Sequence, residues 1–278
     1  MKSIFLPIDD PEVCRPMFEV ALAYARRFGS HIESGATVPV LDNYIVGEMV
    51  PLWPPQQRSM GDIAREAHDV FQSAMMRAGL SPESASSDGG PSFGWYESPL
   101  LGDGAVAARA RVFDATVVGR PTASGSGPRL SLLETIVFES GRPLLIAPPD
   151  AQPETIGDSV VIAWNCSTET ARTTALAMPM LQRAKRVQVL TVEGGTVPGP
   201  SGADMARMLR LNGIPAEELT VSDKGRTSGE AILTHAEGFG ADLLIKGAYT
   251  QSRLRQMIFG GATSHVLAHA RIPVFMAH

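Results

Sequence analysis

The chain has 278 residues, of which 44% are hydrophobic and 19% charged, and its formal net charge is −5. This is the composition of a globular protein, and the length is enough for one large domain or two small ones. The mildly acidic balance, without blocks of Lys or Arg, argues against a protein that binds nucleic acid by neutralising its phosphates.

The N-terminal segment MKSIFLPIDD contains an apolar run that ends in Asp9 and Asp10, with no cleavage site of small residues. A signal peptide is therefore not expected. No stretch approaches the roughly 18 apolar residues of a membrane span, and two cysteines, Cys14 and Cys166, cannot form a disulfide framework. These features predict a cytoplasmic protein.

The first half of the chain alternates between apolar runs and a helical pattern. Residues Ser3–Asp9 predict a buried strand, and a helical pattern rich in Ala and Leu follows from about Pro11 to Phe28. The proline-rich segment Val38–Gln57 predicts a long surface loop. Two further apolar runs, Asp114–Arg120 and Arg142–Ile146, predict the later strands of this half.

The second half repeats this order. A helical pattern runs from about Thr168 to Ala184, and Asp114 aligns with Asp242 as Gly119 aligns with Gly247. The apolar runs that predict its strands are 160–164, 187–192, 218–221, 243–246 and 272–276. We therefore expect two copies of one unit, residues 1–150 and 155–278, joined by a proline-rich linker at 148–153.

Alternating strands and helices predict a parallel sheet with helices on both faces, because parallel strands need crossover connections. Each copy is thus expected to be a small, doubly wound α/β domain. In such folds ligands bind beyond the carboxyl ends of the strands, at the point where the strand order reverses. The residues that follow each strand are therefore the candidate site residues.

Four segments of the second copy carry a family resemblance: Trp164-Asn165, EAILTHAEGFGADLLIKGAY, SRLRQMIFGG and HARIPVFMAH. On these segments the chain resembles the universal stress protein family in its tandem two-domain form. The resemblance implies a Rossmann-like, five-stranded parallel sheet of order 3-2-1-4-5 in each domain. It also implies pairing through the last strands, either between the two domains of one chain as a pseudo-dimer or between two chains as a homodimer.

In one branch of the family, ATP is held by a loop that reads Gly, two residues, Gly, nine residues, then Gly followed by Ser or Thr. Glycines let backbone N–H groups approach phosphate oxygens, and the helix that follows favours anions at its N-terminus. The second copy keeps the spacing from Gly247 to Gly260, with Thr250 in place of the second glycine and Gly261 in place of the hydroxyl. Thr263 could supply a hydroxyl from further along.

Two further residues complete the candidate ATP site of the second copy. The acidic residue that follows the first strand in ATP-binding relatives is Asp9 in the first copy and Asn165 in the second, where the amide can still form hydrogen bonds. Arg253 follows the loop and could meet a phosphate, or it could face solvent. The glycines could equally serve strand ends and helix packing.

The first copy departs further from the motif. It reads Gly119-Arg120-Pro121-Thr122, and Glu134 lies near the position where Gly-Ser would fall. A carboxylate there would repel a phosphate. The first site is therefore expected to be degenerate.

Other candidate sites have fewer supporting residues. His265 and His269 lie at i and i+4 and could face the same way, but no third metal ligand is evident, so no metal site is expected. Cys166, near a helix start, could be an oxidant-sensitive thiol or a half-buried, inert one. Asp9 and Asp10 are typical helix N-caps.

The sequence contains no Gly-x-Ser-x-Gly, His-Glu-x-x-His or Walker-type phosphate loop, so no catalytic residue is assigned. It predicts a cytoplasmic binding and signalling protein with a nucleotide or small-molecule pocket in its second domain. A structural or protein-interaction module is the alternative, and a slow ATP hydrolase is the less favoured third possibility because no general base is positioned.

Overall fold

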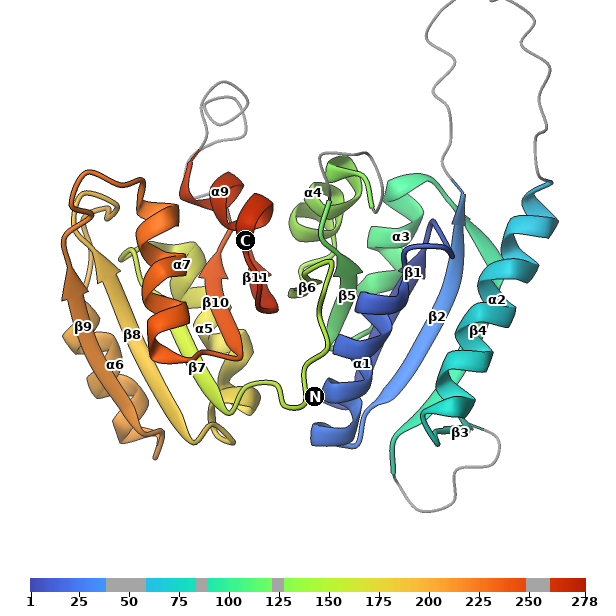
Figure 1. The fold of residues 1–278 in the computed structure, drawn as a ribbon, viewed down its shortest axis with the longest axis horizontal. Coiled ribbons are helices and arrows are strands. Elements are labelled where there is room, and N and C mark those ends of the chain that lie inside the picture. The colour runs from blue at the N-terminus through green and yellow to red at the C-terminus, as the bar shows by residue number, and fades with distance from the viewer. Residues whose placement is uncertain (39–58, 84–89, 122–127, 249–260) are drawn as a thin grey trace, which may run out of the picture.

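The structure is a computed structural model that describes residues 1–38, 59–83, 90–121, 128–248 and 261–278 (Figure 1). The predicted surface loop lies outside these ranges except for Val38, and so do Thr250, Arg253 and Gly260. Within the described residues, no helix is both long and apolar enough to cross a membrane.

The first half of the chain forms five main strands, one two-residue strand and four helices among the described residues. They are β1 (Ser3–Ile8), α1 (Arg15–Phe28), β2 (His31–Val38), α2 (Met60–Arg77), β3 (Ser81–Pro82), β4 (Ser92–Leu101), α3 (Gly102–Ala110), β5 (Ala115–Gly119), α4 (Leu130–Glu139) and β6 (Leu144–Ala147).

The second half forms five strands and four helices among the described residues. They are β7 (Ser159–Ala163), α5 (Thr168–Leu181), β8 (Arg186–Val192), α6 (Gly202–Leu211), β9 (Ala216–Val221), α7 (Ser228–Phe239), β10 (Leu243–Gly247), α9 (Ala262–His269) and β11 (Val274–Ala277). All five strands predicted for this half are present, with ends that differ by one or two residues.

The strands form one continuous sheet of order β3-β4-β2-β1-β5-β6-β11-β10-β7-β8-β9. Counted within each half, the five main strands follow the order 3-2-1-4-5. The two five-stranded halves form one sheet because β6 and β11 pair antiparallel, with Leu145 opposite Phe275. Pairing between the two halves through their last strands was expected, and this pairing is what joins the sheets.

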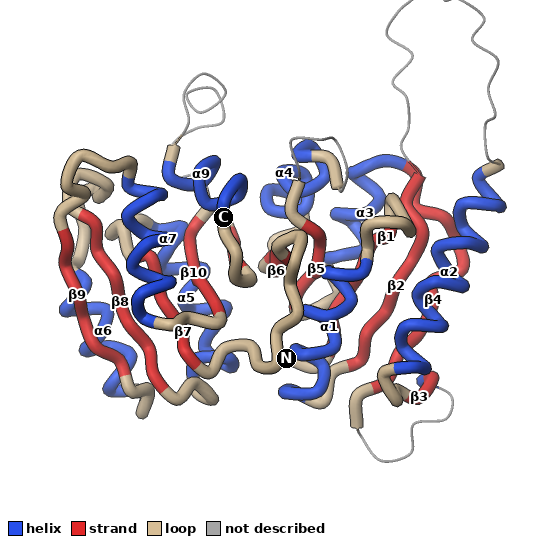
Figure 2. The backbone as a smooth tube through the Cα atoms, viewed as in Figure 1, coloured by secondary structure: helices blue, strands red, loops and turns tan. Residues whose placement is uncertain are grey.

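Helices cover both faces of the sheet, which confirms the doubly wound α/β fold (Figure 2). One buried cluster packs α1, α2, α5 and α6 on one face, and a second packs α3, α4, α7 and α9 on the other. Successive strand residues alternate between the two clusters, as Ile245 and Leu244 of β10 do. Each strand is therefore apolar on both sides, which accounts for the continuous hydrophobic runs in the sequence.

The aligned aspartates of the two copies play the same part. The Asp114 carboxylate accepts hydrogen bonds from the backbone N–H groups of Lys2 and Ser3, at the start of β1. The Asp242 carboxylate accepts 3.0 Å bonds from the backbone N–H groups at the start of β7, including that of Ser159. The backbone N–H bonds at Asp114 hold its pKa below its usual value although burial opposes them. The two copies that the sequence predicts therefore also share the hydrogen bonds between this aspartate and the start of the first strand.

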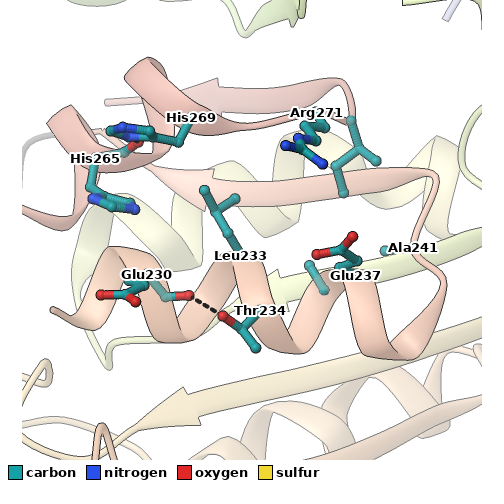
Figure 3. Close-up of a pocket in the computed structure, with 10 residues that line it drawn as sticks. Glu230, Leu233, Thr234, Glu237, Ala241, His265, His269 and Arg271 are labelled. Atoms are coloured by element: carbon teal, nitrogen blue, oxygen red, sulfur yellow. Dashed lines mark hydrogen bonds between the residues drawn. The ribbon is translucent and has the colours of Figure 1, made fainter. Parts of the chain in front are cut away.

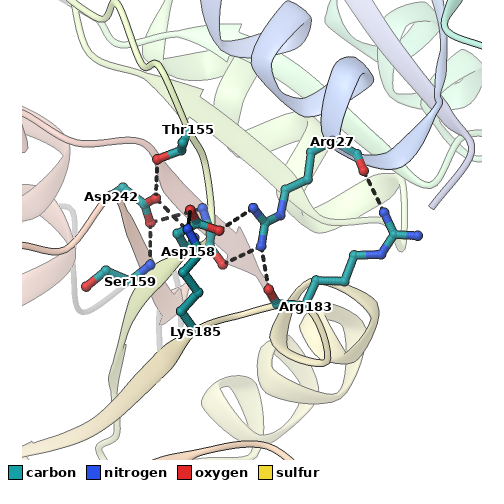
Figure 4. Close-up of polar contacts among 8 residues, drawn as sticks. Arg27, Thr155, Asp158, Ser159, Arg183, Lys185 and Asp242 are labelled. Atoms are coloured by element: carbon teal, nitrogen blue, oxygen red, sulfur yellow. Dashed lines mark hydrogen bonds and ion pairs between the residues drawn. The ribbon is translucent and has the colours of Figure 1, made fainter.

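The two halves are also joined by side chains at the end of the sheet where β7 begins (Figure 4). Arg27 of α1 donates to the Asp158 carboxylate at 2.5 Å and to the carbonyls of Gly157 and Arg183. Arg183 donates back to the Arg27 carbonyl at 2.5 Å. Lys185 adds a second ion pair to Asp158 at 2.9 Å. We call Arg27, Asp158, Arg183 and Lys185 the inter-half clasp.

The first helix begins later than its sequence pattern predicts. It starts at Arg15 with Cys14 as its N-cap residue, so the expectation that Asp9 or Asp10 caps it is wrong. Asp10 instead accepts from the backbone N–H of Glu12 at 3.0 Å and stabilises a turn before the helix. The helix ends where Gly29 takes a left-handed conformation, with φ of 60°.

Candidate functional site

The candidate site of the second half lies where the strand order reverses. Strands β7 and β10 are adjacent and parallel, so their carboxyl ends meet at the same edge of the sheet. Asn165 follows β7, Gly247 ends β10, and Gly261 and Thr263 begin α9. The structure thus describes four of the seven predicted site residues, all near this edge, and Thr250, Arg253 and Gly260 lie outside the described residues.

Asn165 organises the turn between β7 and α5. Its side-chain oxygen accepts from the Thr170 hydroxyl at 2.6 Å and from the Ser167 backbone N–H at 3.3 Å. Ser167 caps the helix by accepting from the Thr170 backbone N–H at 3.2 Å. The amide oxygen of Asn165 therefore holds the first turn of α5 in place.

Gly247 packs directly against this turn. A Cβ at this position would lie 2.6 Å from the Thr170 backbone nitrogen and 2.8 Å from its hydroxyl oxygen. Contacts that short are excluded by sterics, so the close approach of β10 to α5 requires glycine. Helix packing, one of the two explanations given for this glycine by the sequence, thus accounts for it.

The first turn of α9 has no side-chain cap among the described residues. Its N-cap residue is Gly261, in an extended conformation with φ of −86° and ψ of 175°. The other helices of this half begin with hydroxyl caps, namely Ser167, Ser201 and Thr227. Among the described residues, therefore, no side chain accepts from the first N–H groups of α9, which carry a partial positive charge.

Lys246 was not identified from the sequence as a site residue, although it lies immediately before Gly247. Its side chain is only 6% exposed and points to the opposite face of β10 from Gly247, toward α9. Its Nζ donates to the Thr263 hydroxyl at 2.7 Å and to the Gly247 carbonyl at 3.0 Å. Burial lowers the pKa of Lys246 to about 8. The signal in the sequence was a lysine inside the apolar strand LLIKG.

The corresponding edge of the first half has a different set of groups. Burial raises the pKa of Asp9, which follows β1. Arg129, at the start of α4, is paired with Asp103 at 2.7 Å. Arg120 donates to the Ala270 carbonyl of the second half at 2.8 Å, so it is engaged in the contact between halves. Glu134 lies within α4, and the degeneracy of this site stays a prediction.

A cavity of about 370 Å³ lies between α7 and α9, on the same face as Lys246 (Figure 3). Leu233 contributes to its apolar part, and Glu230, His265 and His269 to its polar part. The two imidazole rings are stacked with centroids 4.3 Å apart, so they do face the same way. Among the described residues, no group of three metal-ligating side chains converges here or elsewhere.

Cys166 has a strained backbone but not an activated thiol. Its φ of 68° is unusual for a residue with a side chain, and burial raises its thiol pKa. The helix that follows begins at Thr168, with Ser167 as its cap. The hypothesis of a thiol pKa lowered by the helix N-terminus is therefore wrong, and a half-buried thiol is the description that fits.

Comparisons with known proteins agree with this fold. Residues 165–278 match the model of the universal stress protein family. No curated protein matches the chain. Among solved structures, a universal stress protein from Archaeoglobus fulgidus DSM 4304 is similar over 99% of this chain and 95% of its own, with 17% identity and a TM-score of 0.74. A functionally unknown protein from Pseudomonas aeruginosa PAO1 covers 100% of this chain and 92% of its own, with 13% identity and a TM-score of 0.57.

The family match covers β10 of the two strands that form the site, and it begins just after the end of β7. The structural similarity extends the same fold over the whole chain. The family domain in the second half and the same strand order in the first half agree with the repeat in the sequence. Residues 165–278 thus carry a universal stress protein domain, and the whole chain shares its fold with a solved universal stress protein.

Proposed function

We propose that this protein binds an adenine nucleotide or a similar anionic small molecule at the carboxyl ends of β7 and β10, and that it acts by binding and signalling. The observation that carries the proposal is the N-terminus of α9, which has no side-chain cap in the part of the chain that the structure describes and lies where the strand order reverses. Free N–H groups at a helix N-terminus are suited to phosphate oxygens. The sequence spacing from Gly247 to Gly260 gives further support.

Turnover is not part of the proposal. Asn165 stands after β7, where a carboxylate would be needed to act as a base on that side of the site. Its oxygen is engaged with Thr170 and Ser167. A slow ATP hydrolase therefore has less support than a binding protein, and product analysis after long incubation with ATP and Mg²⁺ tests it.

The alternative is a structural or protein-interaction module without a nucleotide. It is favoured by the packing of Gly247 against Thr170, which explains that glycine without a ligand. Under either proposal, the last strands are occupied within the chain, since β11 pairs with β6 on one side and β10 on the other. A homodimer through these strands is therefore not proposed.

Calorimetric titration with ATP and ADP separates the two proposals. The variant Gly261→Glu places a carboxylate at the start of α9, and Gly261→Gln is its uncharged control. Binding in the wild type that is lost in the Glu variant and largely kept in the Gln variant supports the nucleotide proposal. Absence of wild-type binding at millimolar nucleotide contradicts it and leaves the interaction module.

A further inference from the structure

Lys246 is a buried cation without a counterion among the described residues. It is 94% buried, being 6% exposed, and the two acceptors of its Nζ are a neutral hydroxyl and a neutral carbonyl. Burial is the one cause that shifts its pKa, with no carboxylate opposing it. A buried charge is costly unless it is paired. No carboxylate of the described residues balances this positive charge.

The groups described around this charge are neutral acceptors or add positive potential. The Thr263 hydroxyl accepts from Lys246, so its own proton is left to donate elsewhere. Thr263 lies in the first turn of α9, where the uncapped N–H groups and the helix dipole are also positive. A lysine beside a helix N-terminus is unfavourable by itself, and an anion at the same place removes the conflict.

The neighbouring sequence does not supply that anion. Residues 249–260, which join β10 to α9, include two arginines and no Asp or Glu. The first half provides an internal comparison, because Val118 precedes Gly119 in β5 as Lys246 precedes Gly247 in β10. Val118 is 1% exposed, so an apolar side chain satisfies this position in the fold. The lysine is therefore not required by the architecture.

We propose that Lys246, together with the Thr263 hydroxyl and the first turn of α9, selects a ligand that carries a phosphoryl group. The inference rests on the proposed function for the location of the ligand, and it adds the residue that gives the site its charge preference. Gly261 stands where the family motif has a hydroxyl residue, so that hydroxyl is missing here. Lys246 and Thr263 supply hydrogen-bond donors in its place. The ligand class is then a phosphate ester or an oligophosphate.

Binding of three probes to wild type and two variants tests this role. The probes are ATP, adenosine and inorganic tripolyphosphate, each titrated by calorimetry. Lys246→Met keeps the length of the side chain and removes its charge. Lys224→Met removes the same charge from an exposed position and is the matched control.

We expect ATP and tripolyphosphate to bind the wild type and the Lys224→Met variant alike. Lys246→Met should lower both affinities by about tenfold or more and leave the affinity for adenosine unchanged, as expected for the loss of a charge-assisted hydrogen bond. A lysine that only ties β10 to α9 predicts a different result, in which the variant is less stable but the ratio of ATP to adenosine affinity does not change. That result overturns the inference and leaves the nucleotide proposal standing.

Two further outcomes separate the inference from the proposed function. Tripolyphosphate binding that depends on Lys246, without preference for ATP, supports the inference and contradicts the nucleotide ligand. Absence of binding by either phosphate compound at millimolar concentration overturns the inference. If Lys246→Met does not fold, the ¹³Cε shift of Lys246 is titrated in the wild type: a pKa raised by tripolyphosphate supports the inference, and an unchanged pKa overturns it.

Discussion

Arg27 and Asp158 are 131 residues apart in sequence and form an ion pair of 2.5 Å across the two halves of the molecule. Both side chains are largely buried, with exposed fractions of 18% and 16%. Hydrogen bonds from Lys185 and Arg27 hold the pKa of Asp158 below its usual value. The contact therefore links α1 of the first half to the start of β7 in the second.

Arg27→Met should lower the free energy of unfolding by about 1–3 kcal/mol, because it removes the partner of a partly buried carboxylate and two further hydrogen bonds. Urea denaturation measures the change. Arg65→Met is the control: it breaks an exposed ion pair with Asp62 and should cost less than about 1 kcal/mol. Equal effects of the two variants would show that the inter-half clasp adds no stability of its own.

Lys246 should make stability depend on pH above neutrality. Its folded-state pKa of about 8 lies below its ordinary value of 10.5, so between these pH values the unfolded chain binds more protons than the folded one. Above pH 10.5 the lysine is neutral in both states and its burial as a charge costs no stability. As the pH falls through 8, the free energy of unfolding decreases by up to about 3 kcal/mol. Urea denaturation of wild type and Lys246→Met, compared at each pH from 7 to 10, isolates this group. A difference between them that is independent of pH contradicts the prediction.

Gly247→Ala should destabilise the protein by roughly 1–3 kcal/mol, because the new Cβ would lie 2.6 Å from the Thr170 backbone nitrogen. Gly238→Ala in α7 is the matched control, since its Cβ meets no atom within 4 Å. There the higher helix propensity of alanine should stabilise by up to about 1 kcal/mol. Thermal unfolding of both variants measures the opposite signs, and an unchanged stability of the Gly247→Ala variant would rule out the packing explanation.

Gly261→Ser restores the hydroxyl of the family motif. The backbone φ of −86° suits any residue. Serine in place of glycine at an N-cap position stabilises a helix by roughly 0.3 kcal/mol. We expect a small rise in the melting temperature and tighter ATP binding by calorimetry. Gly261→Ala lacks the hydroxyl and should show neither gain; a gain with alanine would assign the effect to the backbone.

Strands β6 and β11 should not form a dimer interface between two copies of the chain. The edges of β6 and β11 that would pair with another copy already pair with each other. Sedimentation velocity at high protein concentration measures this directly. If a dimer forms, cross-linking between positions in β6 of two copies would contradict the intrachain pairing, whereas contacts elsewhere would leave it intact.

The fold was largely predictable because its signals are local and repeated. Buried parallel strands are apolar on both faces, so runs such as those of β7 and β10 stand out, and the aligned Asp114 and Asp242 marked the two copies. The fusion into one sheet depends on how β6 meets β11, about 130 residues apart, and this pairing was expected only from the family resemblance. The candidate site residues that the structure describes lie near the edge where β7 and β10 end, and the nucleotide role of the glycine spacing stays a prediction. Lys246 was missed because its signal, a lysine inside an apolar strand, does not show that the side chain lies against Thr263 at the start of α9.

The pairing of β6 with β11 also has a consequence during synthesis. Residues Leu144–Ala147 leave the ribosome well before Val274–Ala277, and at about 5–20 residues per second the interval is roughly 10 s. For that time the first half carries an unpaired, fully apolar edge strand, which is a template for association with other chains. The nascent first half is therefore the stage at which this protein is most exposed to aggregation and to capture by chaperones.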